Sequence, residues 1–124
     1  MVIEARRAYN RAYYLANRER VLATSRARYL ADPIAWRQKT DESHRRLKAF
    51  MRQQKEGKVC VRCGFSDPRA LDFHHRDASG KEFSLARAWQ RSYSRQRILA
   101  EIAKCEVLCA NCHRIMHAEE REAV

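Results

Sequence analysis

Two pairs of cysteines, each with two residues between its members, constrain this chain more than any other feature. The first pair is Cys60 and Cys63, followed by Gly64, and the second is Cys109 and Cys112. A C-x-x-C turn lets two thiolates converge on one tetrahedral ion, so two such turns supply the full ligand shell of a structural zinc. Disulfides or inert buried thiols are the alternatives. We expect no signal peptide at the start of the chain, which disfavours a secreted disulfide scaffold.

The composition changes after Gly57, and this change indicates a domain boundary. All five cysteines and four of the five histidines lie beyond it. The fifth cysteine, Cys105, has no partner at the C-x-x-C spacing, and a lone cysteine is usually a small buried residue of the core. A small core often needs a metal for stability. We therefore expect a basic helical arm over residues 1–57 and a domain held together by zinc over residues 58–124.

The positive charge is concentrated in the first half of the chain. The formal net charge is +11, and residues 1–58 hold 15 Lys+Arg against 6 Asp+Glu, whereas residues 59–124 hold 11 against 9. This asymmetry is typical of a protein that binds a polyanion, and nucleic acid is the favoured partner. A solvated helical face is the alternative. The sequence contains no apolar run long enough for a membrane span, so no membrane partner is expected.

The arm is expected to be helical. Alanines and tyrosines recur at helical spacing between Ala5 and Ala16, and this stripe is interpreted as a face that packs against another helix. Arg7, Arg11 and Arg18 lie off the stripe and are candidates for nucleic-acid contacts. Asn17 either caps a second helix or lies inside one long helix over residues 2–31.

Further elements follow from local signals. Asp32-Pro33 is a helix start, because Asp can accept hydrogen bonds from the free first-turn amides and Pro suits the first helical position. The helix is expected to run to about Lys55, with an apolar patch at Leu47, Phe50 and Met51. A second helix is expected over residues 95–104, with Ile98, Leu99 and Ile102 as its apolar face, and a short apolar element at residues 107–108.

Four histidines fall into two groups beside the cysteines. His113 and His117 are four residues apart, so a helix places both on one face, where two imidazoles can bind one metal. The alternation over residues 71–75 predicts a short strand, on which His74 and His75 point to opposite faces. One of them can bind a metal while the other acts as a base only if the strand bends or ends there. Spare histidines on a purely structural zinc module are the alternative.

Together these motifs resemble a known family. C-x-x-C-G, L-D-F-H-H and C-E-V-L-C-A-N-C-H-R-I-M-H, over about residues 58–120, resemble the zinc-bearing HNH endonucleases of phages and prophages. The His-His and His-x-x-x-His pairs are also similar to those of the nuclease colicins. The resemblance implies a small α+β protein in which the basic arm precedes a ββα-metal (His-Me finger) nuclease domain with a four-cysteine zinc site.

The resemblance also implies residue roles. His75 corresponds to the general base, and His74, His113 and His117 correspond to ligands of one catalytic divalent ion, such as Mg²⁺, Mn²⁺, Ni²⁺ or Zn²⁺. The position of the family's middle Asn is occupied by Lys104, and the nearby Asn111 does not fill that position. From their places in the sequence alone, Arg76 and Arg114 are candidates for steadying the phosphate.

The function implied by the resemblance is metal-dependent hydrolysis of DNA phosphodiester bonds, in the cytoplasm of a bacterium or of a phage-infected host cell. Two alternatives remain open. A non-enzymatic nucleic-acid-binding protein stabilised by zinc accounts equally well for the charge and the cysteines, but not for the clustered histidines. An RNA-directed nuclease would use the same site.

Overall fold

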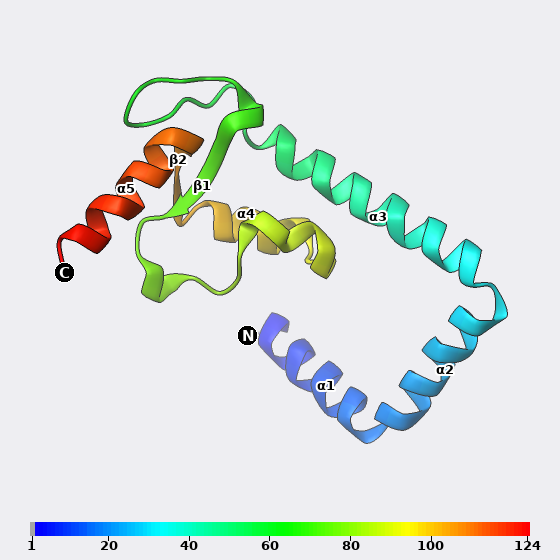
Figure 1. Cartoon of the computed structure of the whole chain (residues 1–124). Helices are drawn as coiled ribbons and strands as arrows, with labels where there is room; N and C mark the ends of the chain where they lie inside the picture. The colour runs from blue at the N-terminus through cyan, green and yellow to red at the C-terminus, as the bar shows by residue number, and fades with distance from the viewer. Residues whose placement is uncertain (1) are drawn as a thin grey trace. The chain divides into compact units, whose positions relative to one another are not determined.

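The computed structural model describes residues 2–124, in which helices lead into a two-stranded sheet (Figure 1). The elements in chain order are α1 (Val2–Ala16), α2 (Arg18–Ala31), α3 (Pro33–Gln53), η1 (Pro68–Ala70), β1 (Leu71–His75), η2 (Ala78–Gly80), η3 (Leu85–Arg91), α4 (Arg95–Ile102), β2 (Cys105–Cys109) and α5 (Ala110–Glu122), where η marks a 3-10 helix. The expected α+β class is confirmed. Within residues 2–124, no helix has the apolar length needed to cross a bilayer.

The first two helices separate at Asn17, which resolves the alternative between one long helix and two. Asn17 occupies the N-cap position of α2, but its side-chain amide donates to the carbonyl of Tyr13 at 2.9 Å and makes no capping hydrogen bond to α2. The expected start of α3 is confirmed, because Asp32 Oδ1 accepts a hydrogen bond from the Ala35 amide at 2.9 Å and Pro33 is the first helical residue.

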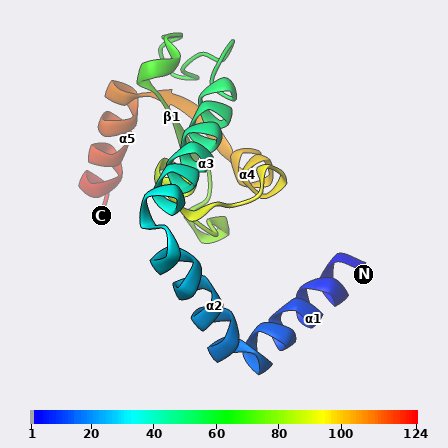
Figure 2. The same cartoon turned by 90° about the vertical axis from the view of Figure 1, so that its right-hand side faces the viewer.

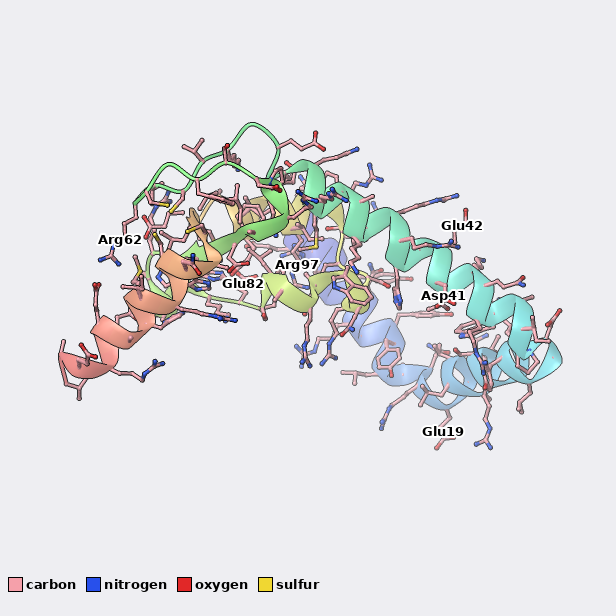
Figure 3. All side chains as sticks on the ribbon, turned by 45° about the horizontal axis from the view of Figure 1, so that its top comes forward. Glu19, Asp41, Glu42, Arg62, Glu82 and Arg97 are labelled. Carbon is pink, nitrogen blue, oxygen red and sulfur yellow. The ribbon has the colours of Figure 1, made fainter. Side chains whose placement is uncertain are left out.

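The Ala/Tyr face of α1 does not pack as expected. No residue of α1 or α2 is buried, and Tyr9 on this face is 70% exposed. The chain divides into two compact units, one ending at Asp41 and the other comprising Glu42–Val124. Figure 3 labels Asp41 and Glu42 within α3.

This division falls earlier in the chain than the expected boundary at Gly57. The physical reason is the apolar patch at the C-terminal end of α3. Met51 is buried, and Leu47 and Phe50 pack against the same core as η3 and α4. The second half of α3 therefore belongs to the folded second unit.

The sheet consists of β1 and β2 paired antiparallel, with Leu71 opposite Cys109 and His75 opposite Cys105. The strand expected over residues 71–75 is confirmed, and β2 covers the short apolar element expected at residues 107–108. α5 begins directly after β2, whereas η2, η3 and α4 lie between β1 and β2 along the chain (Figure 1). This arrangement brings the second C-x-x-C pair and the L-D-F-H-H strand side by side.

Two apolar clusters form the core of the second unit. One comprises Met51, Phe83, Leu85, Ala88, Ile98, Ile102 and Cys105, and the other comprises Cys60, Leu71, Val107, Leu108, Cys109 and Cys112. The expected burial of Cys105 is thus confirmed. The helix expected over residues 95–104 ends at Ile102. Its apolar face differs at one position: Leu99 is 44% exposed, whereas Glu101 is almost completely buried.

Candidate functional site

The four paired cysteines converge at the junction of β2 and α5. Cys60, Cys63, Cys109 and Cys112 each offer a sulfur atom, and these sulfurs all lie within 4.8 Å of one another. All five cysteines of the chain are free thiols. The cluster could therefore hold a metal ion such as zinc, and the site that the sequence predicts is assembled by the fold.

Local hydrogen bonds explain how the two cysteine turns meet. The Val61 amide donates to the Val107 carbonyl at 2.9 Å and fastens the first turn to β2. Gly64 has a φ of +79°, a left-handed conformation that favours glycine, and its amide donates to the Cys60 carbonyl at 2.9 Å. In the second turn Cys109 caps α5, because its sulfur accepts a hydrogen bond from the Cys112 amide at 3.4 Å.

The electrostatics of the cysteine cluster favour a bound cation. Burial opposes ionisation of the Cys60 thiol, but backbone hydrogen bonds from Cys109, Cys63 and Arg62 outweigh it and lower the pKa of Cys60 to about 6. The neighbouring Cys109 sulfur and burial raise the pKa of Cys112 to about 12. One thiolate thus forms readily while a second is strongly opposed, and a cation removes this opposition by binding the deprotonated sulfurs.

Three histidines form a second cluster. His74 on β1 and His113 and His117 on α5 each offer a ring nitrogen, and these nitrogens also lie within 4.8 Å of one another. The ring centroids of His74 lie 5.1 Å and 5.2 Å from those of His113 and His117. The helical spacing expected for His113 and His117 therefore brings both rings to one place, and the strand adds His74 from across the sheet.

Carboxylates fix the orientation of two of these rings. His113 Nδ1 lies 3.1 Å from Asp72 Oδ2, and His117 Nδ1 lies 3.1 Å from Glu120 Oε2. With Nδ1–H donated to a carboxylate in each case, the two Nε2 atoms carry lone pairs and face each other at 3.0 Å. Two facing lone pairs at this distance repel, so the arrangement suits a metal ion that both nitrogens could bind.

Burial lowers the pKa of the third ring, His74, and the neighbouring imidazoles of His113 and His117 lower it further. A neutral imidazole is the form that binds metal ions. The histidine cluster could therefore hold a metal ion with three nitrogen ligands, the set that the family resemblance implies.

His75 points to the other face of β1 and does not join this cluster. Its Nε2 lies 2.6 Å from Glu101 Oε1, and the two side chains are only 10% and 2% exposed. The strand ends at His75, the condition under which adjacent histidines can take separate roles. The structure thus separates His74 from His75 as the alternation of the strand predicts.

Glu101 is the centre of a polar network. Besides His75, it accepts hydrogen bonds from the Glu82 amide at 3.1 Å and from Lys104 Nζ at 3.0 Å. Burial alone would raise the pKa of Glu101, but hydrogen bonds from Lys104, the Glu82 amide and His75 outweigh it and lower the pKa to about 2. Glu101 is therefore a carboxylate at neutral pH, and it accepts a hydrogen bond from the Nε2–H of His75. Figure 3 labels Glu82, beside Arg97.

Lys104 takes part in this network through Glu101. It stands where the family that the chain resembles has an Asn, but it does not take over the contact of that Asn with the histidine base. Its ammonium also donates to the Gly80 carbonyl at 2.9 Å, so it ties α4 to the loop after β1. In this chain a carboxylate, with a lysine behind it, contacts the imidazole of His75. Asn111 lies exposed on α5.

The arginines proposed from the sequence are all on the surface. Arg7, Arg11 and Arg18 are exposed on α1 and α2, and Arg114 is exposed on α5. Arg76, just after β1, donates through Nη1 to the Ala103 carbonyl at 3.2 Å. None of the five is positioned by a carboxylate partner among the described residues.

Three residues of the site were missed by the motif analysis: Asp72, Glu101 and Glu120. Each had a signal in its spacing. Asp72 lies two residues before His74 on the strand and so shares its face, whereas Glu120 lies one helical turn after His117. Glu101 interrupts the apolar face of α4, where a buried carboxylate requires a partner.

In comparisons with known proteins, no family model matches the chain, and neither a similar curated protein nor a similar solved structure was found.

Proposed function

We propose that this protein is a metal-dependent HNH-type endonuclease that hydrolyses phosphodiester bonds of DNA. The observation that carries the proposal is the pairing of two arrangements on one strand. His74 contributes to a three-imidazole cluster that suits a divalent ion, and the next residue, His75, is held by a buried carboxylate. A protein that only bound nucleic acid would need neither arrangement.

The two ion sites have different roles in this proposal. Four sulfurs fill all positions of a tetrahedral zinc, so an ion there is structural and has no place for substrate. Three imidazoles leave positions open, as at catalytic sites. A divalent ion such as Mg²⁺, Mn²⁺, Ni²⁺ or Zn²⁺ held there would supply positive charge at the scissile phosphate and at the leaving 3′ oxygen.

His75 is the proposed general base. Because the Glu101 carboxylate accepts the Nε2–H, the lone pair of the neutral ring is on Nδ1. Nδ1 takes a proton from water as the water oxygen attacks phosphorus, and the bond from phosphorus to the 3′ oxygen breaks. Glu101 stabilises the imidazolium that results. Glu101 thereby orients His75, the role that the resembling family gives to Asn.

Plasmid nicking with a series of added cations tests this function. We expect the wild-type protein to relax supercoiled DNA only when a divalent ion is added. His117→Ala removes one of three ligands, so it should weaken binding of the added ion and raise the concentration needed for cleavage. Calorimetric titration of the zinc-loaded protein measures that affinity, and His44→Ala is the matched control because His44 packs against Trp89, outside the cluster.

A folded, DNA-binding protein that cuts nothing with any cation would contradict the proposal and favour the zinc-stabilised binding protein. Cleavage of RNA in preference to DNA would keep the site and change its substrate.

The N-terminal unit is proposed to supply affinity for DNA. Residues 1–41 contain 9 Lys+Arg and 4 Asp+Glu, and Arg7, Arg11 and Arg18 are exposed there. Removal of residues 1–41 should weaken DNA binding and flatten its dependence on salt by about 0.9 in the log–log slope for each phosphate that the arm neutralises. Fluorescence anisotropy at several salt concentrations measures both quantities.

This truncation stops at Asp41 because Leu47, Phe50 and Met51 pack in the core of the second unit. The shortened protein should therefore keep its circular dichroism spectrum and some cleavage at low salt. An unchanged salt slope would show that the arm does not contact phosphates.

A further inference from the structure

A groove of about 750 Å³ lies within the unit Glu42–Val124, and none of the four clustered cysteines lines it. Its lining comes from α3, η1, β1 and η3. Figure 2 shows the C-terminal half of α3 in front of β1. His113 of the histidine cluster also lines it, so the groove reaches the candidate metal site.

The groove is strongly basic. Arg45, Lys48 and Arg52 follow the three- and four-residue spacing of one helical face, and all three line it. Lys55 adds a further cation to the lining, whereas Arg69, which also lines the groove, is paired with Asp67 at 2.7 Å. Among the described residues that line the groove, Asp72 is the one acidic side chain, and it contacts His113. The charge favours a polyanionic occupant.

Aromatic rings lie among these cations. Trp89 and Phe73 both line the groove and are partly exposed. The ammonium of Lys48 lies 5.1 Å from the centre of the Trp89 ring, and that of Lys55 lies 5.6 Å from the centre of Phe73. The lysine side chains are flexible, so each ammonium can move to a phosphate while a base takes its place over the ring.

We propose that this groove binds an unpaired segment of nucleic acid and leads it to the histidine cluster. Bases stack on Trp89 and Phe73, and phosphates contact the basic face of α3. The inference rests on the proposed nuclease function and deepens it by naming the substrate class: strands with unpaired nucleotides beside the bond that is cut.

The combination of features selects this occupant. A cavity of this volume accepts small molecules or a few nucleotides, and it is too small for a duplex. In a duplex the base faces are stacked on one another and cannot contact a ring, whereas unpaired bases can. An acidic peptide would satisfy the cations, but it would bring no phosphate to His113.

The test is binding without turnover, in buffer with no added divalent ion. The chain has two tryptophans, so Trp36→Phe leaves Trp89 as the single emitter. We expect a single-stranded oligonucleotide to quench Trp89 emission and to bind more tightly than its duplex. Trp89→Ala should weaken single-strand binding roughly 5- to 150-fold, the effect of one base stack, and leave duplex binding unchanged. Trp36→Ala is the matched control.

A second variant tests the groove even if Trp89→Ala does not fold. Arg45→Ala should lower the salt slope of single-strand binding by about 0.7, whereas Arg46→Ala, its neighbour outside the groove, should not. Equal affinities for single strand and duplex, or unchanged Trp89 emission, would overturn the inference. The same titration is carried out with single-stranded RNA. Stronger quenching of Trp89 by RNA than by DNA would support binding of unpaired nucleic acid in the groove and identify RNA as the preferred ligand. Quenching by a protein that cuts nothing would support the groove and contradict the nuclease.

Discussion

Cys109→Ser is expected to unfold the unit Glu42–Val124 and to abolish binding of the zinc proposed at the four sulfurs. Cys109 ends β2, caps α5 and lies within 4.8 Å of the other three clustered sulfurs, so its replacement affects strand, helix and metal together. A structural zinc contributes on the order of 10 kcal/mol to folding in small domains, a loss that the free energy of unfolding of a domain of this size cannot offset. Elemental analysis measures the zinc, and thermal melts followed by circular dichroism measure the fold.

Cys105→Ala is the matched control for this prediction. Cys105 is equally buried, but it belongs to the other apolar cluster and lies outside the sulfur cluster. It should lower the free energy of unfolding by only about 1 kcal/mol and retain zinc. A folded Cys109→Ser protein, or a wild-type protein that folds without zinc, would contradict the structural role.

His75→Ala is expected to reduce the cleavage rate by about 10²- to 10⁴-fold, the usual contribution of a general base. His75 is not a member of the histidine cluster, whose ligands are His74 on β1 and His113 and His117 on α5, so metal affinity and the KM for DNA should change little. Single-turnover cleavage and calorimetric metal titration separate the two effects. Equal cleavage by the wild type and His75→Ala would remove His75 from the mechanism.

Glu101→Gln tests whether Glu101 orients the imidazole of His75 or serves only the packing of α4. Glutamine keeps the size and can hydrogen-bond to His75, but it can donate as well as accept, so the tautomer of His75 is no longer fixed. The rate constant kcat should fall while KM and the fold are retained. A variant with normal kcat would show that Glu101 serves only the packing of α4.

The sequence was most informative where local pattern and chemistry coincide. The alternation over Leu71–His75 predicted β1, and the C-x-x-C spacing predicted a cysteine cluster that the fold assembles. The strand pairing brings His74 to His113 and His117, which no spacing could have established because 38 residues separate His74 from His113.

Other features depend on tertiary packing. The unit boundary at Asp41 depends on where the second half of α3 packs. The basic composition of residues 1–57 did not indicate that Arg45, Lys48 and Arg52 belong to the second unit and line a groove within it. Glu101 was overlooked because a glutamate on a helix is usually solvated. Only the fold shows that it is enclosed beside His75 and Lys104.

Because α5 carries ligands of both clusters, the order in which the two ions bind is expected to be fixed. The first two turns of α5 carry Cys112, His113 and His117, and Cys109 caps it, so one rigid helix supplies ligands to both clusters. If zinc creates this helix by folding the unit, the histidine cluster exists only in zinc-loaded molecules. The two ions then load sequentially, and the apparent affinity for the second ion depends on the first. If the proposed nuclease function holds, zinc supply would then limit the number of active molecules, whatever the concentration of the second ion.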